Sequence, residues 1–206
     1  MKVNYKEHWE KVFSTKKENE VSWYQPKPET SLNFFIDNTI PKQAKIIDIG
    51  GGDSYLMDFL LDLGYTNLYL LDISPKAIER IKNRLGAKAK QISFIISDVL
   101  DFNSTETFDV WHDRASFHFQ TSQENILNYK KKVAKYVKAD GHVFIGTFSE
   151  NGPKKCSGLD ITQYNSKSLQ TVFYPEFDLV SSFVENHKTP FDTNQNFIFA
   201  HFKKNE

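Results

Sequence analysis

The chain has 206 residues, enough for one domain with a sizeable core, and its 26 basic and 26 acidic residues cancel. This balance argues against nucleic acid as the main partner, because phosphate binding needs a basic surplus. The single cysteine, Cys156, excludes an internal disulfide and favours a reducing cytoplasm, and the absence of an apolar leader or a run of membrane-spanning length predicts no membrane partner.

The first quarter of the chain predicts two helices separated by a loop. Residues 4–13 begin with a capping box, Asn4 to Glu7, and predict a helix. Residues 14–29 are polar and contain two prolines, which indicates a loop. Residues 30–39 have the amphipathic pattern of a short helix.

Strands and helices then alternate along the chain. Apolar runs predict parallel strands at 44–49, 67–73, 91–97, 108–113 and 142–149. The helices between them are predicted at 54–64, from Pro75 to a stop at Gly86 with Ser74 as cap, and at 121–141, with a Thr121 to Glu124 capping box and a stop at Gly141. A loop at 98–107 is expected to separate the third and fourth strands.

The end of the chain predicts a loop, a short helix and an antiparallel hairpin. Residues 151–165 are expected to form the loop and 166–173 the helix. Two runs, 177–189 and 195–204, alternate in polarity around a turn at Pro190 to Asn194.

These elements predict an α/β, Rossmann-like fold with a seven-stranded, mostly parallel sheet, helices on both faces and a C-terminal antiparallel hairpin. We expect one domain, 1–206, in three parts: an N-terminal helical or lid segment (1–43), a cofactor-binding core (44–149), and an acceptor-side loop, helix and hairpin (150–206). Ligands of such sheets bind outside the carboxyl ends of the strands, so the residues there are the candidates for a site.

Each of the first four predicted strands ends in a carboxylate. The first three end at Asp48, Asp72 and Asp98, and the fourth at His112 and Asp113. We therefore expect an acidic rim along one edge of the sheet. Asp53, at the start of the first helix between strands, belongs to this rim or caps its helix.

The loop after the first strand resembles a nucleotide loop but does not suit phosphate. Gly50 and Gly52 match the first two glycines of G-x-G-x-x-G, whereas Tyr55 occupies the third position. A diphosphate there would be repelled by nearby carboxylates, at roughly 4 kcal/mol for like charges about 4 Å apart at a dielectric constant near 20. The missing Gly-Lys-Ser/Thr excludes a P-loop.

The ligand that fits is a nucleoside without phosphate that carries positive charge, and S-adenosylmethionine has these features. Gly50, Gly51 and Gly52 would let the backbone pass close under its methionyl part. Asp72, with Ile73 beside it, would accept from both ribose hydroxyls. Asp98 would accept from the adenine amino group, with Val99 against the ring.

The chain resembles the class I S-adenosylmethionine-dependent methyltransferases. The resemblance rests on "IIDIGGGDS", "LYLLDIS", "FIISDVLDF", "FDVWHDRASFHF" and "GHVFIGTFS", which span 45–149 in the family's order and spacing. It implies methyl transfer from S-adenosylmethionine, with S-adenosylhomocysteine as product. A narrower similarity, to thiopurine S-methyltransferases, rests on "HWEKVF", "VSWYQ" and "HDRASF".

Two residues at the fourth strand end are the candidate catalytic groups. His112 is expected beside the sulfonium, either as a general base or as a cofactor contact through its backbone carbonyl. Asp113 is the second candidate, with an ion pair to Arg114 as the alternative. Trp23 is expected either to cover the cofactor as a lid or to pack the N-terminal helix. The histidine spacing shows no metal-ligand pattern, so no metal site is expected.

The sequence leaves the methyl acceptor open. A small soluble acceptor, such as a thiol or an organic acid, is favoured, with a protein side chain as the alternative. A third hypothesis is a module that binds S-adenosylmethionine without turnover. The fourth strand does not end in the Asn/Asp-Pro-Pro-Tyr/Phe sequence typical of base methylation, and the oligomeric state stays open, a monomer included.

Overall fold

The computed structural model describes residues 4–206, so the first three residues of the predicted N-terminal segment lie outside it. Its main sheet has seven strands in the order β3-β2-β1-β4-β5-β9-β8. Their bounds are β1 Lys45–Ile49, β2 Asn67–Asp72, β3 Ile92–Ile96, β4 Phe108–Arg114, β5 Val137–Phe148, β8 Phe177–Lys188 and β9 Asn194–Lys204. Strands β1 to β5 form the parallel part of the sheet, and β9 and β8 add antiparallel at one end, which confirms the predicted fold class.

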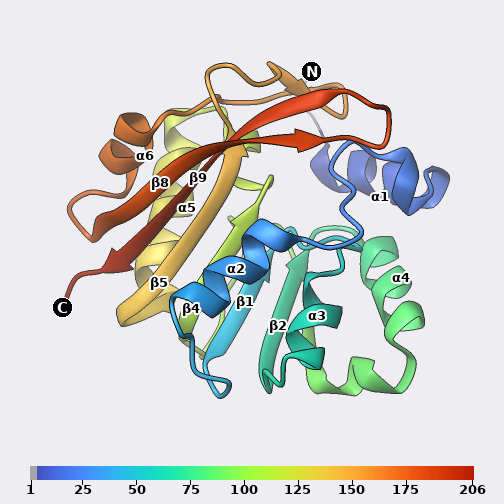
Figure 1. Ribbon diagram of the computed structural model, residues 1–206, viewed down its shortest axis with the longest axis horizontal. Helices are drawn as coiled ribbons and strands as arrows, with labels where there is room; N and C mark the ends of the chain where they lie inside the picture. The colour runs from blue at the N-terminus through green and yellow to red at the C-terminus, as the bar shows by residue number, and fades with distance from the viewer. Residues whose placement is uncertain (1–3) are drawn as a thin grey trace.

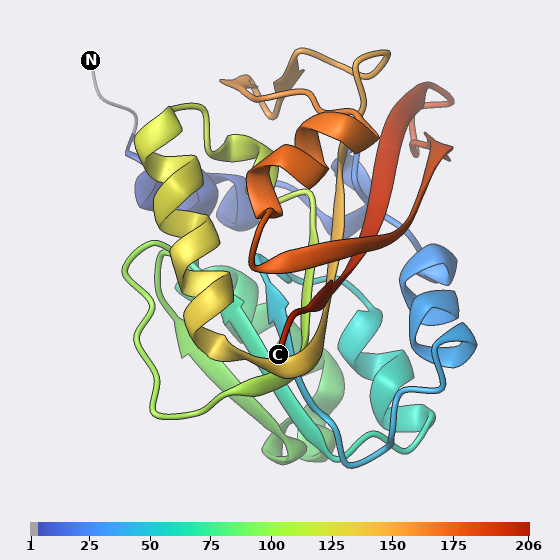
Figure 2. The same ribbon diagram turned by 90° about the vertical axis from the view of Figure 1, so that its left-hand side faces the viewer.

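Helices cover both faces of the sheet (Figures 1 and 2). Their bounds are α1 Tyr5–Thr15, α2 Glu29–Asp37, α3 Leu56–Asp62, α4 Pro75–Leu85, α5 Gln123–Tyr136 and α6 Ser166–Phe173. The apolar sides of α2, α3 and α4 share one core cluster, and those of α5 and α6 share the other. Helix α1 lies at the same end of the molecule as the start of α4 (Figure 1), and its Tyr5 and Trp9 pack against the first cluster.

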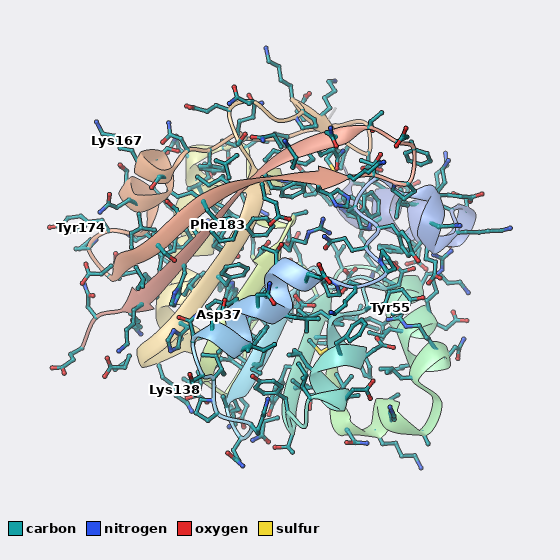
Figure 3. All side chains as sticks on the ribbon, viewed as in Figure 1. Asp37, Tyr55, Lys138, Lys167, Tyr174 and Phe183 are labelled. Carbon is teal, nitrogen blue, oxygen red and sulfur yellow. The ribbon has the colours of Figure 1, made fainter. Side chains whose placement is uncertain are left out.

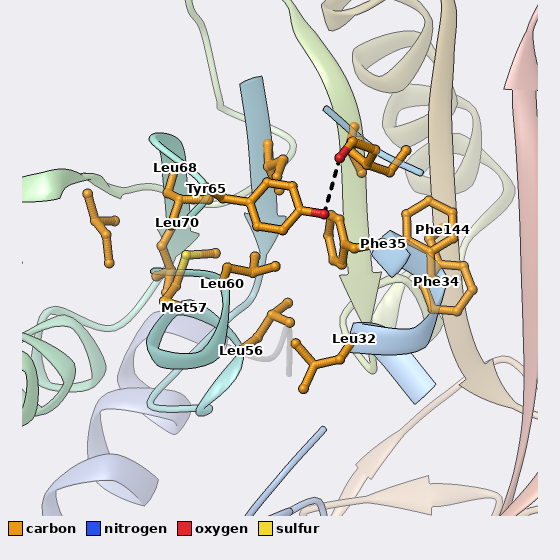
Figure 4. Packing of buried hydrophobic residues seen from close by; sticks show 14 of the residues in the cluster. Leu32, Phe34, Phe35, Leu56, Met57, Leu60, Tyr65, Leu68, Leu70 and Phe144 are labelled. Atoms are coloured by element: carbon orange, nitrogen blue, oxygen red, sulfur yellow. Dashed lines mark hydrogen bonds between the residues drawn. The ribbon is translucent and has the colours of Figure 1, made fainter. Parts of the chain in front are cut away.

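The core on the α2 and α3 side is built from leucines and aromatic rings (Figure 4). Phe34 of α2 stacks on Phe144 of β5 with ring centroids 4.5 Å apart. Tyr65, which follows α3, is buried and donates its hydroxyl hydrogen to the carbonyl of Ile40 over 3.3 Å. Because the hydroxyl is paired, the ring contributes its apolar area to the core without leaving a buried polar atom unsatisfied.

The predicted helix starts at Asn4 and Ser74 are confirmed. The Asn4 side chain accepts from the backbone N–H of Glu7, and the Ser74 side chain accepts from that of Ala77. Pro75 occupies the first turn of α4, where its missing N–H has no helical partner to lose. Gly86 ends the helix with φ +55°, a conformation that favours glycine.

Two boundaries in the second half of the chain differ from the prediction. Helix α5 is capped by Ser122 instead of Thr121 and ends at Tyr136, not near Gly141. Val137 pairs with Phe108 of β4, so the polar residues 138–141 extend β5 instead of the helix. The predicted loop 151–165 contains a short two-stranded sheet, β6 Lys155–Cys156 and β7 Leu159–Asp160.

A buried polar network joins β4 to α5. The hydroxyl of Tyr129, on α5, donates to Asp113 over 2.6 Å and accepts from the indole N–H of Trp111 over 3.0 Å. All three side chains are buried, and both partners lie on β4. The network therefore fixes which face of β4 meets the helix.

Removing the central hydroxyl tests this network. Tyr129→Phe leaves the Trp111 N–H and one Asp113 oxygen unpaired, and it should lower the free energy of unfolding by about 1–3 kcal/mol. Urea denaturation followed by circular dichroism measures the change. The matched control is Tyr174→Phe, at an exposed position on the periphery of the molecule (Figure 3), which should leave stability unchanged. Equal stability of the two variants would contradict the assigned role.

Candidate active site

A cavity of about 900 Å³ lies at the carboxyl ends of β1 to β4. Its floor comes from the strand ends and the loops that follow them, and α1 with residues 16–28 contributes the opposite wall. Every residue predicted to contact the cofactor lines this cavity: Trp23, Asp48, Gly50, Gly51, Gly52, Asp53, Asp72, Ile73, Asp98, Val99 and His112. The topology therefore brings them together, and their role as contacts stays a prediction.

The glycine turn after β1 leaves no room for side chains. Gly50 and Gly52 have φ of +62° and +57°. A Cβ on Gly51 would lie 2.5 Å from a carboxylate oxygen of Asp48, and one on Gly50 would lie 2.7 Å from the Cβ of Ser116. The backbone of this turn is thus a bare surface at the cavity floor, over which a ligand can lie close to the main chain.

Asp72 is held at the end of β2 by the turn beside it. Its two oxygens accept from the backbone N–H groups of Gly52, over 2.9 Å, and Ser74, over 2.8 Å. Burial raises the pKa of Asp72 to about 7, against the lowering effect of these two donors. Each oxygen keeps a lone pair for a hydroxyl donor, so the fixed carboxylate suits a diol.

Asp48 and His112 form the centre of a buried hydrogen-bonded chain. They are paired in register on β1 and β4, and the Asp48 carboxylate lies 2.7 Å from Nδ1 of His112. Nε2 of His112 lies 2.8 Å from the hydroxyl of Ser31, on α2. Both ring nitrogens are engaged, so His112 as arranged positions its neighbours and presents no free nitrogen to a substrate.

The structure argues against a catalytic role for Asp113. Successive residues of a strand point to opposite faces, so Asp113 faces α5 while His112 and Arg114 line the cavity. One Asp113 oxygen accepts from the N–H groups of Ser116 and Phe117. Burial raises its pKa to about 6, and these donors oppose the rise.

The alternative for Asp113, an ion pair with Arg114, is wrong. Arg114 donates instead to the carbonyl of Trp23 over 2.7 Å. The same alternation explains the error, because adjacent strand residues cannot turn their side chains toward each other.

Asp53 does not cap α3, and its carboxylate is paired with an arginine. Helix α3 begins three residues later, with Tyr55 as its cap residue and no side-chain cap bond. Arg80 of α4 donates to Asp53 over 3.0 Å. The acidic rim therefore differs from the prediction: Asp48, Asp72 and Asp98 line the cavity, Asp53 lines it as the ion-pair partner of Arg80, and Asp113 lies on the other face of the sheet.

The N-terminal segment is fastened across the cavity by polar and aromatic contacts. Glu10 of α1 accepts from the hydroxyl of Ser74 and from the N–H of Lys76, at the start of α4. Trp23 packs edge-on against Trp9, with centroids 5.7 Å apart, and also lines the cavity. Trp23 therefore packs α1 as one of its two interpretations expected, and its role as a cover over the cofactor stays a prediction.

On the side of the cavity toward β5, Cys156 lines the wall. Burial raises the pKa of its thiol to about 12, so it is not a thiolate near neutral pH. Ser157 and Tyr164 do not line the cavity. Ser31 and Arg80 are site residues that the sequence did not predict, because each lies on a helix far along the chain from its partner and carries no local signal.

Comparison with known proteins supports the chemistry expected of this cavity. A family model described as a methyltransferase domain matches residues 40–191. That range contains every sequence piece on which the class I resemblance rests, so the expected resemblance to the methyltransferases is confirmed. The narrower similarity to thiopurine S-methyltransferases is not confirmed by these matches.

Two curated relatives differ in the acceptor that their names give. The eEF1A lysine and N-terminal methyltransferase of Mus musculus is 30% identical over 126 residues, which cover 61% of this chain and 18% of that protein. Malonyl-[acyl-carrier protein] O-methyltransferase 1 of Ilyobacter polytropus is 25% identical over 167 residues, which cover 81% and 57%. The chain thus spans less than two thirds of either relative.

Solved structures share the fold across nearly the whole chain. The N-methyltransferase NodS from Bradyrhizobium japonicum, in complex with S-adenosyl-L-homocysteine, superposes with a TM-score of 0.72 at 14% identity and covers 96% of this chain and 98% of its own. A protein from a study of disulfide-to-thioacetal conversion in echinomycin biosynthesis gives 0.78 at 17% identity, with 97% and 93% coverage. At these identities the likeness concerns the fold alone.

The glycine turn gives a direct test of the cavity floor. Gly52→Ala adds a Cβ 3.0 Å from the Phe13 ring, whereas Gly64→Ala adds one with nothing within 4 Å. Both positions have positive φ, so both variants should lose about 1–2 kcal/mol of stability from backbone strain. Only Gly52→Ala should also lose S-adenosylhomocysteine binding in titration calorimetry. Equal affinity of the two variants would show that the turn does not contact the ligand.

The buried Asp72 predicts a pH dependence of cofactor binding. Hydroxyl donors stabilise the ionised carboxylate, so binding must release a proton when Asp72 is protonated, below its pKa of about 7. Affinity for S-adenosylhomocysteine should be constant above pH 7 and fall below it, approaching about tenfold per pH unit. Calorimetry from pH 5.5 to 8.5 measures this. Asp72→Asn should remove the dependence, and a flat wild-type profile would contradict the assignment.

Proposed function

The chain belongs to the methyltransferase domain family, and on that premise we propose that it transfers a methyl group from S-adenosylmethionine to a small soluble acceptor. The observation that carries the proposal is the shared cavity floor, where the bare glycine turn lies beside the fixed carboxylates of Asp72 and Asp98. The single cysteine leaves a reducing compartment, the cytoplasm, as the proposed location.

The residues on the floor fit a cationic adenosyl compound. Asp72 would accept from the ribose hydroxyls, and Asp98, whose carboxylate is oriented by the N–H of Leu100, would accept from the adenine amino group. One buried oxygen of Asp48 has no partner among residues 4–206, and it offers an acceptor to an ammonium group above the turn. Bound there, S-adenosylmethionine would supply an electrophilic methyl group.

The protein's own contribution to such a transfer is alignment and exclusion of water. The wall formed by α1 and residues 16–28 faces the strand ends, and Trp9 and Trp23 give it an apolar surface. Phe119, which lies outside this wall, packs against Trp9 and also lines the cavity. The chain of Asp48, His112 and Ser31 fixes the side chains between floor and wall. No step in this arrangement requires a metal or a covalent intermediate on the protein.

The size of the cavity favours a small acceptor over a protein side chain. Its volume of about 900 Å³ lies at the upper end of the range of roughly 300–1,000 Å³ for small-molecule sites, which leaves room for an acceptor beside the cofactor. The name of the Ilyobacter relative, a malonyl-carrier O-methyltransferase, points to an acid as its acceptor and supports an organic acid here. The name of the mouse relative keeps a protein side chain as the second candidate.

Substitution of Asp72 tests the cofactor pose. Asp72→Ala removes two acceptors for the ribose and should weaken S-adenosylmethionine binding by about 1–3 kcal/mol in titration calorimetry. Wild-type protein titrated with NAD should give no binding, because the rim carboxylates repel a diphosphate. Tight binding of S-adenosylmethionine by Asp72→Ala would overturn the assigned pose.

A labelling experiment distinguishes the acceptor classes. The protein is incubated with methyl-labelled S-adenosylmethionine and a cell lysate, and the lysate is then split by size. Label in the small-molecule fraction is the expected result, and label in protein would favour the second candidate. Cofactor binding without label in either fraction would favour a module that binds without turnover.

A further inference from the structure

Arg114 presents a free, buried edge of its guanidinium group. Its Nη1 donates to the carbonyl of Trp23, but Nε and Nη2 are buried and have no hydrogen-bond partner among residues 4–206. The group lies over the Phe197 ring, 5.1 Å from its centroid, and it lines the cavity. Leaving charged donors buried and unpaired costs free energy, so this arrangement calls for a partner from outside the described chain.

The acids nearest to Arg114 do not supply that partner. Glu185 accepts from the Thr30 hydroxyl with both oxygens, over 2.9 and 2.7 Å. One oxygen of Asp48 contacts His112, and the other makes no hydrogen bond to Arg114. Burial lowers the pKa of Arg114 to about 10, which still leaves it charged at neutral pH. The positive charge is therefore held at the wall by Trp23, Phe197 and the strand, not by a carboxylate.

The chain itself shows what this edge of a guanidinium binds. Arg84 uses the same two atoms, Nε and Nη2, to bind both carboxylate oxygens of Asp58, over 3.1 and 2.8 Å. The two parallel N–H groups of this edge match the spacing of a carboxylate. Several carboxylates already line the cavity, among them Asp48, Asp72, Asp98 and Asp101, so a singly charged acid suits it better than a phosphate.

We propose that the Nε/Nη2 edge of Arg114 binds a carboxylate of a ligand in the cavity. The inference rests on the proposed function and extends it to the class of ligand. Two sources carry that group, the acceptor and the methionyl part of the cofactor. The acceptor is favoured, because Arg114 pairs in register with Gly146 of β5 and neighbours Cys156, on the far side of β4 from the acids of β2 and β3.

Matched acid and amide probes test the acceptor as the source. Acetate, benzoate and indole-3-acetate, each with its amide, are titrated into the complex with S-adenosylhomocysteine and followed by ligand-observed NMR. At least one acid should bind about tenfold or more tightly than its amide, and Arg114→Gln should abolish that preference. Arg114→Lys, which keeps the positive charge but loses the two parallel N–H groups, should retain only part of the preference for acids.

Cofactor analogues test the other source. S-adenosylhomocysteine carries the methionyl carboxylate and 5′-methylthioadenosine does not. If Arg114→Gln weakens only the first of these about tenfold, the cofactor supplies the carboxylate. If neither the acid preference nor this difference is found while S-adenosylhomocysteine still binds, the inference is overturned and the proposed function stands. Failure of wild-type protein to bind S-adenosylhomocysteine would instead overturn the proposed function.

Two controls separate recognition from structure. Lys88→Gln removes one positive charge from an exposed ion pair with Asp62, outside the cavity, and should change none of these affinities. Arg114→Gln should unfold at the same temperature as wild type or higher, because it removes an unpaired buried charge. A large loss of stability would mean that Arg114 serves the fold instead, and the wild-type preference for acids over amides then decides alone.

Discussion

The cavity depends on one hydrogen bond between neighbouring parallel strands, that of Asp48 with His112. The two residues are paired in register at the centre of the sheet, and His112 extends the contact to Ser31 of α2. These hydrogen bonds therefore join β1, β4 and α2 next to the floor of the cavity. Burial makes the bond strong, and it also makes each partner costly to leave unpaired, so the three elements hold a single arrangement.

The cavity is divided into two chemical halves by β4. On the side of β1 to β3, the walls offer carboxylates and a bare backbone turn, which suit a ligand with hydroxyl and ammonium donors. Toward β5, the walls offer Arg114, aromatic rings and a neutral thiol. A cofactor with hydroxyl and ammonium donors fits the carboxylate half, and an acceptor with an acid group fits the Arg114 half. A ligand that places a phosphate at the glycine turn does not fit.

The features of α4 that depend on neighbours along the chain were predicted well from the sequence. Ser74, Pro75 and Gly86 bound α4 as expected, because capping and positive φ are local properties. The end of α5 was not predicted, since Val137 leaves the helix to pair with Phe108, a contact between distant residues. The partners of Asp53 and Asp113 were missed for the same reason: Arg80 and Tyr129 reach them only after the sheet has formed.

Side chains alternate between the two faces of β4, so consecutive residues have different roles. Trp111 and Asp113 fasten the strand to α5, while His112 and Arg114 face the ligand. Side chains alternate between the two faces of a strand, so deleting or inserting one residue in β4 would move each later side chain to the opposite face. Residues that contact α5 would then point into the cavity, and residues that face the ligand would point into the core. Relatives that keep this architecture should therefore vary in side-chain identity along β4 but not in its residue count.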